Sequence, residues 1–273
     1  MRNIFVKIFF NILLKLSSTA IKRNSTEPLF IKKILHQLNI LLGKGFAGRN
    51  SLEVETDLVR NYLDFNKELI LIDVGANRGR YSDLLIRGLP KFKLFMFEPN
   101  NENYEFLISK FNHKKDVVIE KFGLSDKSTT TKLYSDKLGS GMASLSKRNL
   151  DHFNKSFEIE EKIEVIKFEE YWSKNMKNRQ IDLLKLDIEG HELSALKGCG
   201  KMINMIKLIQ FEFGGCNIDS GTYFQDFWYF FQEKNFEIYR ISPIKLLKIN
   251  EYSEVDEFFT TTNYLAVNKN LIT

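Results

Sequence analysis

Residues 69–82, with the sequence LILIDVGANRGRYS, join an apolar run to an acidic residue and a glycine turn. The four apolar residues 69–72 are typical of a strand that is buried on both faces of a parallel sheet. After the turn, Tyr81, Leu84 and Leu85 fall at helical spacing. The stretch therefore predicts a strand, a ligand-binding turn and a helix, which is the beginning of an α/β fold.

The turn itself has the pattern D-x-G-x-x-x-G, which begins at Asp73 and contains Gly75 and Gly79. Because glycine has no side chain, we expect both glycines to let the backbone approach a ligand closely. A dinucleotide-binding turn would instead have the pattern G-x-G-x-x-G. Asp73, at the end of the strand, is predicted to hold an ammonium group of the ligand. The alternative is a turn that only joins a strand to a helix, since such turns are common in α/β proteins.

The composition of the chain limits its class. Its 273 residues suffice for one large α/β domain with an extension, and 43% hydrophobic and 27% charged residues exclude disordered and fibrous proteins. Residues 1–50 contain nine lysines and arginines but one acidic residue, Glu27. The remainder has a slight acidic excess, which argues against a nucleic-acid groove. Cys199 and Cys216 form no zinc pattern, and a chain of this size needs no disulfide, so we expect a cytoplasmic protein.

Two domains are predicted, a helical extension at residues 1–50 and an α/β domain at residues 51–273. Residues 2–16 carry apolar side chains at helical spacing and lysines on the opposite stripe, which predicts an amphipathic basic helix. This helix is too short to span a bilayer, which takes about 20 apolar residues. Two interpretations remain open: it lies peripherally at the inner face of the membrane, or it packs on the protein or on a partner subunit. A second helix is expected over residues 28–42.

From Leu69 onward strands and helices alternate, which predicts a mostly parallel sheet with helices on both faces. Strands are expected at 69–73, 93–97, 117–119, 181–187, 208–213, 236–241 and 264–267, and two short polar strands at 129–134 and 164–168 flank a loop rich in glycine and serine. Ligands of such sheets bind beyond the carboxyl ends of the strands. Glu98, at the end of the second strand, is therefore predicted to accept hydrogen bonds from the hydroxyl groups of a ribose.

A second stretch, residues 181–192 with the sequence IDLLKLDIEGHE, again ends a strand in an acid. Asp187, Glu189, His191 and Glu192 crowd the end of this strand, beside the start of the next helix. Negative charge is favourable at a helix N-terminus, so capping explains one of these groups. Capping does not readily explain all four at the edge where the first two strands also end. We therefore expect Asp187, Glu189 and His191 to be catalytic.

Together, the stretches 72–82, 97–100 and 181–198 resemble the signature of the FkbM-type methyltransferases. The resemblance covers about residues 55–268. It implies a Rossmann-like class I sheet of seven strands, in which the last strand is antiparallel, and S-adenosylmethionine as the cofactor. Transferred to this sequence, it implies the following cofactor-binding residues: Asp73, Gly75, Ala76, Asn77 and Gly79 at the methionine end, Glu98 at the ribose, and Asp187 facing the methyl group.

The resemblance also implies O-methylation of a hydroxyl group, frequently on a sugar of a natural product, a lipid or a surface polysaccharide. Methyl transfer from a sulfonium requires that donor and acceptor are positioned, and that a base or a metal ion helps to remove the hydroxyl proton. His191 has an unperturbed pKa near neutrality, as expected of a base. The alternative is a magnesium ion on Asp187 and Glu212, because oxygen ligands suit that ion.

Three other function classes compete with this hypothesis. A nicotinamide oxidoreductase would need the pattern G-x-G-x-x-G, which is absent. An RNA or DNA base methyltransferase would share the donor site, but its N/D-P-P-Y/F motif is absent and the core is not basic. The intact motifs argue against the third, a non-catalytic binding protein on the same fold. We therefore expect a small-molecule or glycan acceptor and no nucleic acid, and we leave open whether the chain is a homo-oligomer.

Overall fold

The computed structural model describes residues 11, 12, 14, 15, 18, 29–48, 51–176 and 179–272. The basic helix predicted at residues 2–16 lies mostly outside these residues. Among the described residues, no helix is both long enough and apolar enough to cross a bilayer.

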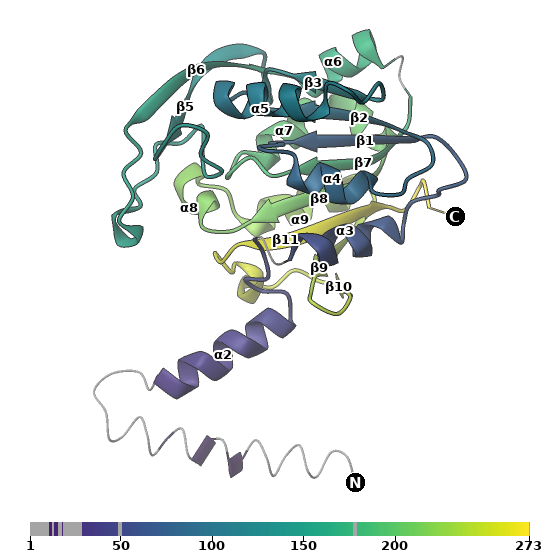
Figure 1. The fold of residues 1–273 in the computed structure, drawn as a ribbon. Helices are drawn as coiled ribbons and strands as arrows, with labels where there is room; N and C mark the ends of the chain where they lie inside the picture. The colour runs from purple at the N-terminus through teal and green to yellow at the C-terminus, as the bar shows by residue number, and fades with distance from the viewer. Residues whose placement is uncertain are drawn as a thin grey trace.

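A sheet of eight strands forms the centre of the α/β domain (Figure 1). In spatial order its strands are β10 (Leu246–Ile249), β9 (Phe236–Ile241), β11 (Thr262–Asn268), β8 (Ile206–Phe213), β7 (Ile181–Leu186), β1 (Leu69–Val74), β2 (Phe92–Phe97) and β3 (Val117–Glu120). The pairs of neighbouring strands from β8 to β3 are all parallel, whereas β11 is antiparallel to both β8 and β9. A mostly parallel sheet with an antiparallel last strand is therefore confirmed.

The predicted count of seven strands is wrong, because β10 adds an eighth strand at one edge. It pairs antiparallel with β9 after a tight reversal of the chain. Ser242 stabilises this reversal, since its hydroxyl donates to the carbonyl oxygen of Lys245 at 2.6 Å and its backbone amide donates to the same oxygen at 3.2 Å. With four residues and one paired edge, β10 lacks the long apolar run that indicates a strand in a sequence.

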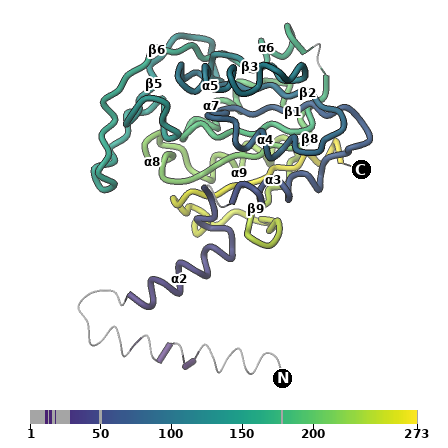
Figure 2. The backbone as a smooth tube through the Cα atoms, in the orientation of Figure 1, coloured from purple at the N-terminus to yellow at the C-terminus, as the bar shows by residue number. Residues whose placement is uncertain are grey.

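Helices cover both faces of the sheet (Figures 1 and 2). On one face, the core contains residues of α6 (Phe168–Asn175), α7 (Glu192–Gly198) and α9 (Phe224–Glu233). On the other, it contains residues of α3 (Leu52–Arg60), α4 (Arg80–Ile86) and α5 (Asn101–Phe111). Phenylalanines fill much of the first face; the ring of Phe211 stacks on those of Phe227 and Tyr264 at centroid distances of 4.9 and 5.3 Å. This arrangement confirms the predicted α/β architecture.

A smaller sheet of three strands lies beside the main one, in the order β4 (Gly123–Leu124), β6 (Ile159–Ile166) and β5 (Thr129–Ser135). The two predicted polar strands are β5 and β6, but β6 begins earlier than expected and ends before Phe168, where α6 starts. Residues 136–158 connect them and contain the predicted glycine- and serine-rich segment. We call these residues the β5–β6 loop.

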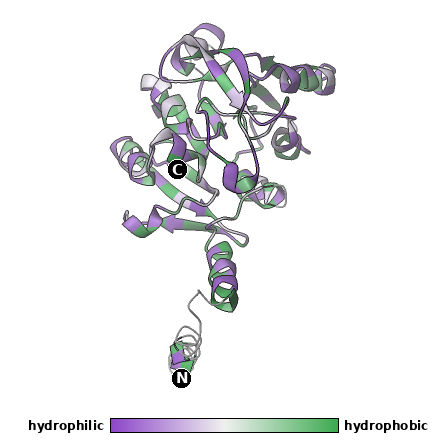
Figure 3. Cartoon of the chain, turned by 90° about the vertical axis from the view of Figure 1, so that its left-hand side faces the viewer, coloured by the Kyte–Doolittle hydropathy of each residue, from purple (hydrophilic) through white to green (hydrophobic). Residues whose placement is uncertain are grey.

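The second predicted helix is present as α2 (Leu29–Leu41), which projects away from the α/β domain (Figure 1). Hydrophobic residues occur along it although it lies outside the body of the domain (Figure 3). The segment after α2 is packed on the domain: the Gly45 amide donates to Thr262 Oγ1 at 3.0 Å, and Lys44 Nζ donates to the carbonyl oxygen of Val255 at 2.7 Å. Short η helices and α8 (Cys216–Ser220) complete the described elements.

Candidate active site

Two neighbouring cavities lie at the carboxyl ends of the parallel strands. The small cavity is lined by the glycine turn after β1, by the turn after β7, and by Glu98 and Pro99 after β2. Its apolar lining residues include Leu124, Leu133, Ile163 and Val165. The large cavity has a volume of about 1200 Å³ and extends between the glycine turn, the β5–β6 loop and the ends of β7 and β8. Both are lined by Gly75, Asn77, Gly141, Asp187 and Glu189, which therefore form a shared wall. Ligands of open α/β sheets bind at this edge.

Glu98 lines the small cavity, where two backbone amides hold its carboxylate. The amide of Asn77 donates to Oε2 at 2.7 Å, and the amide of Asn100 donates to Oε1 at 2.9 Å. Burial raises the pKa of Glu98 to about 7, although these two hydrogen bonds oppose the shift. Each oxygen of a carboxylate can accept more than one hydrogen bond. Glu98 therefore fits the predicted partner of a pair of ribose hydroxyls.

Asp73 lies behind the two cavities and lines neither of them. Its side chain is fully buried in β1, accepts a hydrogen bond from Ser82 Oγ at 2.6 Å and lies 3.2 Å from Lys185 Nζ. The ammonium group of Lys185 therefore pairs with Asp73. The predicted contact between Asp73 and the cofactor stays a prediction, since Asp73 is the penultimate residue of β1 and its carboxylate faces Lys185.

The two glycines of the first turn are required by packing within the protein. Gly75 has a φ of +75°, and a Cβ atom there would lie 1.9 Å from the carbonyl oxygen of Asp187. Gly79 has a φ of +67°, and a Cβ atom there would lie 2.5 Å from the ring of Phe111. Gly75 still lines both cavities, as predicted for a residue at the ligand. However, its substitution would displace β7 from the turn, so it cannot serve to test a ligand contact.

Lys185 is a site residue that the sequence analysis did not single out. It is 6% exposed, and its Nζ lies 3.2 Å from a carboxylate oxygen of both Asp73 and Asp187 and 5.0 Å from the centroid of the Tyr81 ring. Burial lowers the pKa of Lys185, but the two carboxylates outweigh burial and the net shift is upward. The lysine is therefore charged at neutral pH. A lysine among the leucines of a buried strand was the available signal, because a buried lysine needs a partner.

A chain of buried polar groups continues from Tyr81 below the large cavity. The Tyr81 hydroxyl donates to the side-chain oxygen of Gln210, and Gln210 Nε2 donates to Glu55 Oε2 at 3.1 Å. The hydroxyl of Ser51 donates to the other oxygen of Glu55. Burial raises the pKa of Glu55 to about 7, although these hydrogen bonds oppose the shift. The chain of contacts ties α3 to the floor of the cavity.

The turn after β7 has an unusual backbone. Glu189 and Gly190 have φ angles of +54° and +99°. Left-handed non-glycine residues are uncommon, and such strain is concentrated at functional sites. The carboxylate of Glu192 holds this turn, since it accepts the amides of Ile188 at 2.9 Å and Gly190 at 3.1 Å and is fully buried. Of the four groups that crowd this strand end, Glu192 thus stabilises the turn.

His191 shares the small cavity with Asp187 and Glu189. It lines the small cavity only, and its Nε2 lies 3.1 Å from the hydroxyl of Ser146. Burial lowers the pKa of His191. His191 and Glu212 thus line different cavities, which share Asp187 and Glu189 in one wall.

Glu189, Glu212 and Cys216 form a group in the described part of the chain whose potential ligand atoms all lie within 4.8 Å of one another. Burial and the charge of Asp187 raise the pKa values of Glu189 and Glu212, and burial raises that of the Cys216 thiol. Magnesium prefers oxygen ligands, and a protonated thiol is a poor ligand. Asp187, the other predicted ligand, is paired with Lys185. This set of donors does not fit a magnesium ion.

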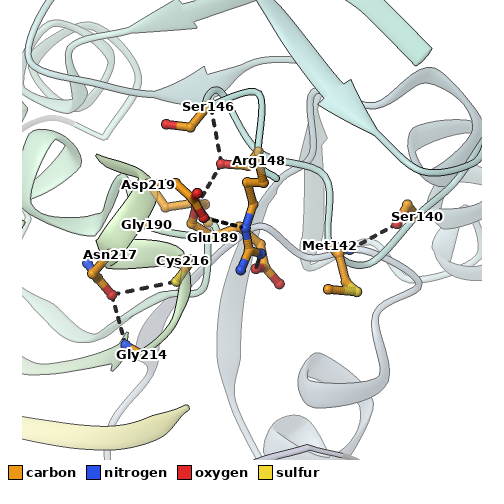
Figure 4. A network of polar contacts seen from close by, with 12 residues as sticks. Ser140, Met142, Ser146, Arg148, Glu189, Gly190, Gly214, Cys216, Asn217 and Asp219 are labelled. Carbon is orange, nitrogen blue, oxygen red and sulfur yellow. Dashed lines mark hydrogen bonds and ion pairs between the residues drawn. The ribbon is translucent and has the colours of Figure 1, made fainter. Parts of the chain in front are cut away.

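Arg148, from the β5–β6 loop, lines the large cavity and lies beside Glu189 and Asp219 (Figure 4). Its Nη1 donates to Glu189 Oε2 and its Nε donates to Asp219 Oδ2, both at 2.9 Å, and it is 8% exposed. Ser144 Oγ donates to the carbonyl oxygen of Glu189 at 2.8 Å. These contacts fasten the loop to the turn after β7. An arginine in a polar loop carries no signal in the sequence, so its role was not predicted.

Comparison with known families agrees with this geometry. Residues 73–238 match the family model described as the methyltransferase FkbM domain, which is more than half of the chain. The chain belongs to the FkbM methyltransferase family. The resemblance inferred from the sequence is thereby confirmed, and the protein is an enzyme of the methyltransferase class. No curated protein matches the chain.

Several solved methyltransferase structures are similar to this FkbM methyltransferase at low identity. An O-methyltransferase from Thermotoga maritima has 13% identity and a TM-score of 0.43, over 89% of this chain and 72% of that one. An rRNA methylase from Streptococcus thermophilus has 11% identity and a TM-score of 0.41, over 78% and 93% of the two chains. TrmK from M. capricolum, in complex with S-adenosylhomocysteine, has 10% identity and a TM-score of 0.41, over 79% and 68%. The family assignment comes from the domain match.

The buried acids of this FkbM methyltransferase predict that its stability falls as the pH rises. Burial raises the pKa values of Glu55, Glu98 and Glu192 from 4.5 to about 7. Between these values the folded state binds more protons than the unfolded state, so the free energy of unfolding decreases with pH. The lowered pKa of His191 opposes this trend, but it is one group against five, because the pKa values of Glu189 and Glu212 are raised as well. We expect Glu55, Glu98 and Glu192 each to contribute a loss of about 2–3 kcal/mol between about pH 5 and pH 8, measured by urea unfolding.

Two variants of α3 provide the control for this pH dependence. Glu55→Gln removes one of the titrating groups and is expected to flatten the slope. Glu53→Gln changes an exposed carboxylate in the same helix and is expected to leave the slope unchanged. A free energy of unfolding that stays constant or rises over this range in the unmodified protein would contradict the prediction.

Proposed function

We propose that the enzyme transfers a methyl group from S-adenosylmethionine to a hydroxyl group of a sugar, in a glycan, a glycolipid or a natural product. The observation that supports this proposal most directly is the pair of cavities that share Asp187 and Glu189 in one wall. Two adjoining cavities suit a donor and an acceptor, and the shared carboxylates lie where the two would meet.

The small cavity fits the nucleoside part of the donor. Glu98 offers acceptors for the ribose hydroxyls, and apolar residues such as Leu124 and Val165 offer a surface for the adenine ring. When bound, the donor supplies a methyl group that is activated by the positive charge of its sulfonium. The carboxylate of Asp187, 38% exposed in the shared wall, favours a cation at that position by electrostatic attraction.

The large cavity fits an acceptor that is rich in hydroxyl groups. Its volume of about 1200 Å³ exceeds the range of roughly 300–1000 Å³ that is usual for one ligand. The lining contains many hydrogen-bonding side chains, among them Arg148, Asn149, Asp219, Thr260, Thr261 and Asn263. An acceptor hydroxyl in this cavity would adjoin the carboxylates of the shared wall, and Asp187 is the one we propose as the group that receives its proton. Lys185 would hold that carboxylate in place.

Binding of S-adenosylhomocysteine, measured by calorimetry, tests the donor site. Glu98→Ala is expected to weaken binding by about 10–100-fold, because hydrogen bonds to a charged group contribute about 1.5–3 kcal/mol. Glu105→Ala, an exposed change on α5, serves as the control and should bind like the unmodified protein. Thermal unfolding of both variants verifies that the fold is retained. Equal affinity in the two variants would refute the assignment of Glu98.

The acceptor is tested by mass spectrometry after incubation with S-adenosylmethionine. The panel contains neutral oligosaccharides, acidic oligosaccharides, glycolipids and a structured RNA. We expect the mass of at least one saccharide to increase by one methyl group. Methylation of the RNA with no methylation of any saccharide would overturn the proposed acceptor class.

A further inference from the structure

Helix α2 presents an apolar surface that the domain does not cover. None of its residues is buried, and it lies outside the body of the domain (Figure 3). Seven large apolar residues of this region are between 37% and 67% exposed: Leu29, Phe30, Ile34, Leu35, Leu38, Leu41 and Leu42. At the helical repeat most of them fall on one side, whereas Lys32, Lys33 and His36 fall on the other. An exposed apolar surface of this kind indicates an interaction site.

The charge around this surface is strongly positive. Residues 1–50, which include α2, carry nine lysines and arginines and one acidic residue. The sequence before α2 also has the apolar and basic pattern of an amphipathic helix. A second copy of this region would bring like charges together. An apolar helix with surrounding basic residues is instead complementary to the surface of a bilayer that contains anionic lipids.

The connection between α2 and the domain places this surface near the large cavity. A Cβ atom at Gly43 would lie 2.3 Å from the carbonyl oxygen of Ile241, so the chain is closely packed where α2 ends. Arg240 Nη1 donates to the carbonyl oxygen of Leu42 at 3.4 Å. Gly45, which follows directly and is held by Thr262, lines the large cavity together with Ala47. The surface and the cavity are therefore joined by a short anchored segment.

We propose that α2 binds peripherally to the surface of an anionic bilayer, and that this contact holds the large cavity beside the lipid headgroups. This second part rests on the proposed function. It specifies the acceptor class further, because a cavity at the membrane surface would receive a saccharide that is attached to a lipid.

Co-sedimentation of the full chain with lipid vesicles tests this proposal. Vesicles with phosphatidylglycerol and vesicles of phosphatidylcholine alone are compared at low and high salt. We expect at least about tenfold stronger partitioning to the anionic vesicles, and a decrease at high salt, because each basic residue near a charged surface strengthens binding several-fold. The double variant Leu35→Glu/Leu38→Glu should lose at least about tenfold in partitioning, since two apolar contacts become charged.

The matched control places the same two charges at the opposite edge of the domain. Val118, on the edge strand β3, and Phe106, on α5, are 39% and 41% exposed, so Val118→Glu/Phe106→Glu introduces the same charge away from α2. This control should partition like the unmodified chain. Equal partitioning of both double variants would overturn the proposal. A dimer in light scattering that Leu35→Glu/Leu38→Glu dissociates, without vesicle binding of the unmodified chain, would show that a second copy covers α2 and would also overturn it.

Calorimetry with S-adenosylhomocysteine on the same proteins separates this inference from the proposed function. Substitutions on α2 are expected to leave the affinity for this compound unchanged. Loss of vesicle binding with retained affinity identifies α2 as the membrane contact. A chain that binds neither type of vesicle but does bind S-adenosylhomocysteine refutes the membrane contact alone. A chain that binds vesicles but not S-adenosylhomocysteine refutes the donor site alone.

Discussion

Replacement of Lys185 by methionine is expected to lower the free energy of unfolding by about 3–5 kcal/mol at neutral pH, because it leaves a buried carboxylate without its partner. Asp73 is fully buried, and the ammonium group of Lys185 at 3.2 Å is the cation beside it. Methionine retains much of the apolar stem of lysine, so the loss reflects the charge more than the packing. Urea unfolding at constant pH measures this change.

The double variant Lys185→Met/Asp73→Asn tests whether the unpaired charge causes the loss. Asparagine keeps an oxygen that can accept the hydrogen bond from Ser82 but carries no charge. We expect the double variant to recover most of the stability that the single variant loses, which a double-mutant cycle expresses as a coupling energy. If Lys185→Met costs less than about 1 kcal/mol, or if the two losses add, the ion pair is not what stabilises this part of the sheet.

Replacement of Asp187 by asparagine is expected to lower the turnover of a methylated saccharide by about 10²–10⁴-fold, because the acceptor hydroxyl loses its base. The variant also removes a negative charge from the wall that the two cavities share. Affinity for S-adenosylmethionine, which carries a sulfonium, should therefore decrease more than affinity for the uncharged thioether of S-adenosylhomocysteine. Rate measurements and calorimetry with both compounds record the two effects. A purely structural role of Asp187 would change both affinities equally.

His191→Ala is the matched comparison, since His191 lines the small cavity only. We expect it to alter donor affinity more than turnover. A loss of turnover as large as that of Asp187→Asn, with unchanged donor affinity, would make His191 the base. Treatment with a chelator is expected to leave turnover unchanged, because the Glu189, Glu212 and Cys216 group does not fit magnesium. Abolished activity that magnesium restores would contradict this expectation.

The local sequence was sufficient to predict the elements around the site. The apolar run before Asp73 and the helical spacing after Gly79 define a buried strand, a turn and a helix over a few residues, and the structure has β1 and α4 at these positions. Glu98 and Asp187 were predicted to lie at one edge because parallel strands end on the same side of a sheet. Both line the small cavity, as the topology requires.

The partners of the charged groups could not be predicted in the same way, because they depend on the register between strands that are distant in sequence. Asp73 and Lys185 are paired residues of β1 and β7, more than a hundred positions apart. This register places Lys185 beside Asp73 in a buried ion pair. A shift by one residue would send the lysine side chain to the opposite face of the sheet.

The sequence by itself thus determined the α/β fold, the family and the edge of the sheet where the acids lie, because these follow from short-range periodicity and from motifs read in order. The tertiary structure alone determined which contacts each of those acids makes. It placed the carboxylate of Glu192 against the turn that carries Glu189, and it brought Arg148 from the β5–β6 loop to Glu189. It also placed His191 and Glu212 in the linings of different cavities. These contacts form because segments that are distant in sequence pack together and bury charged groups beside one another. A local sequence pattern does not specify such packing.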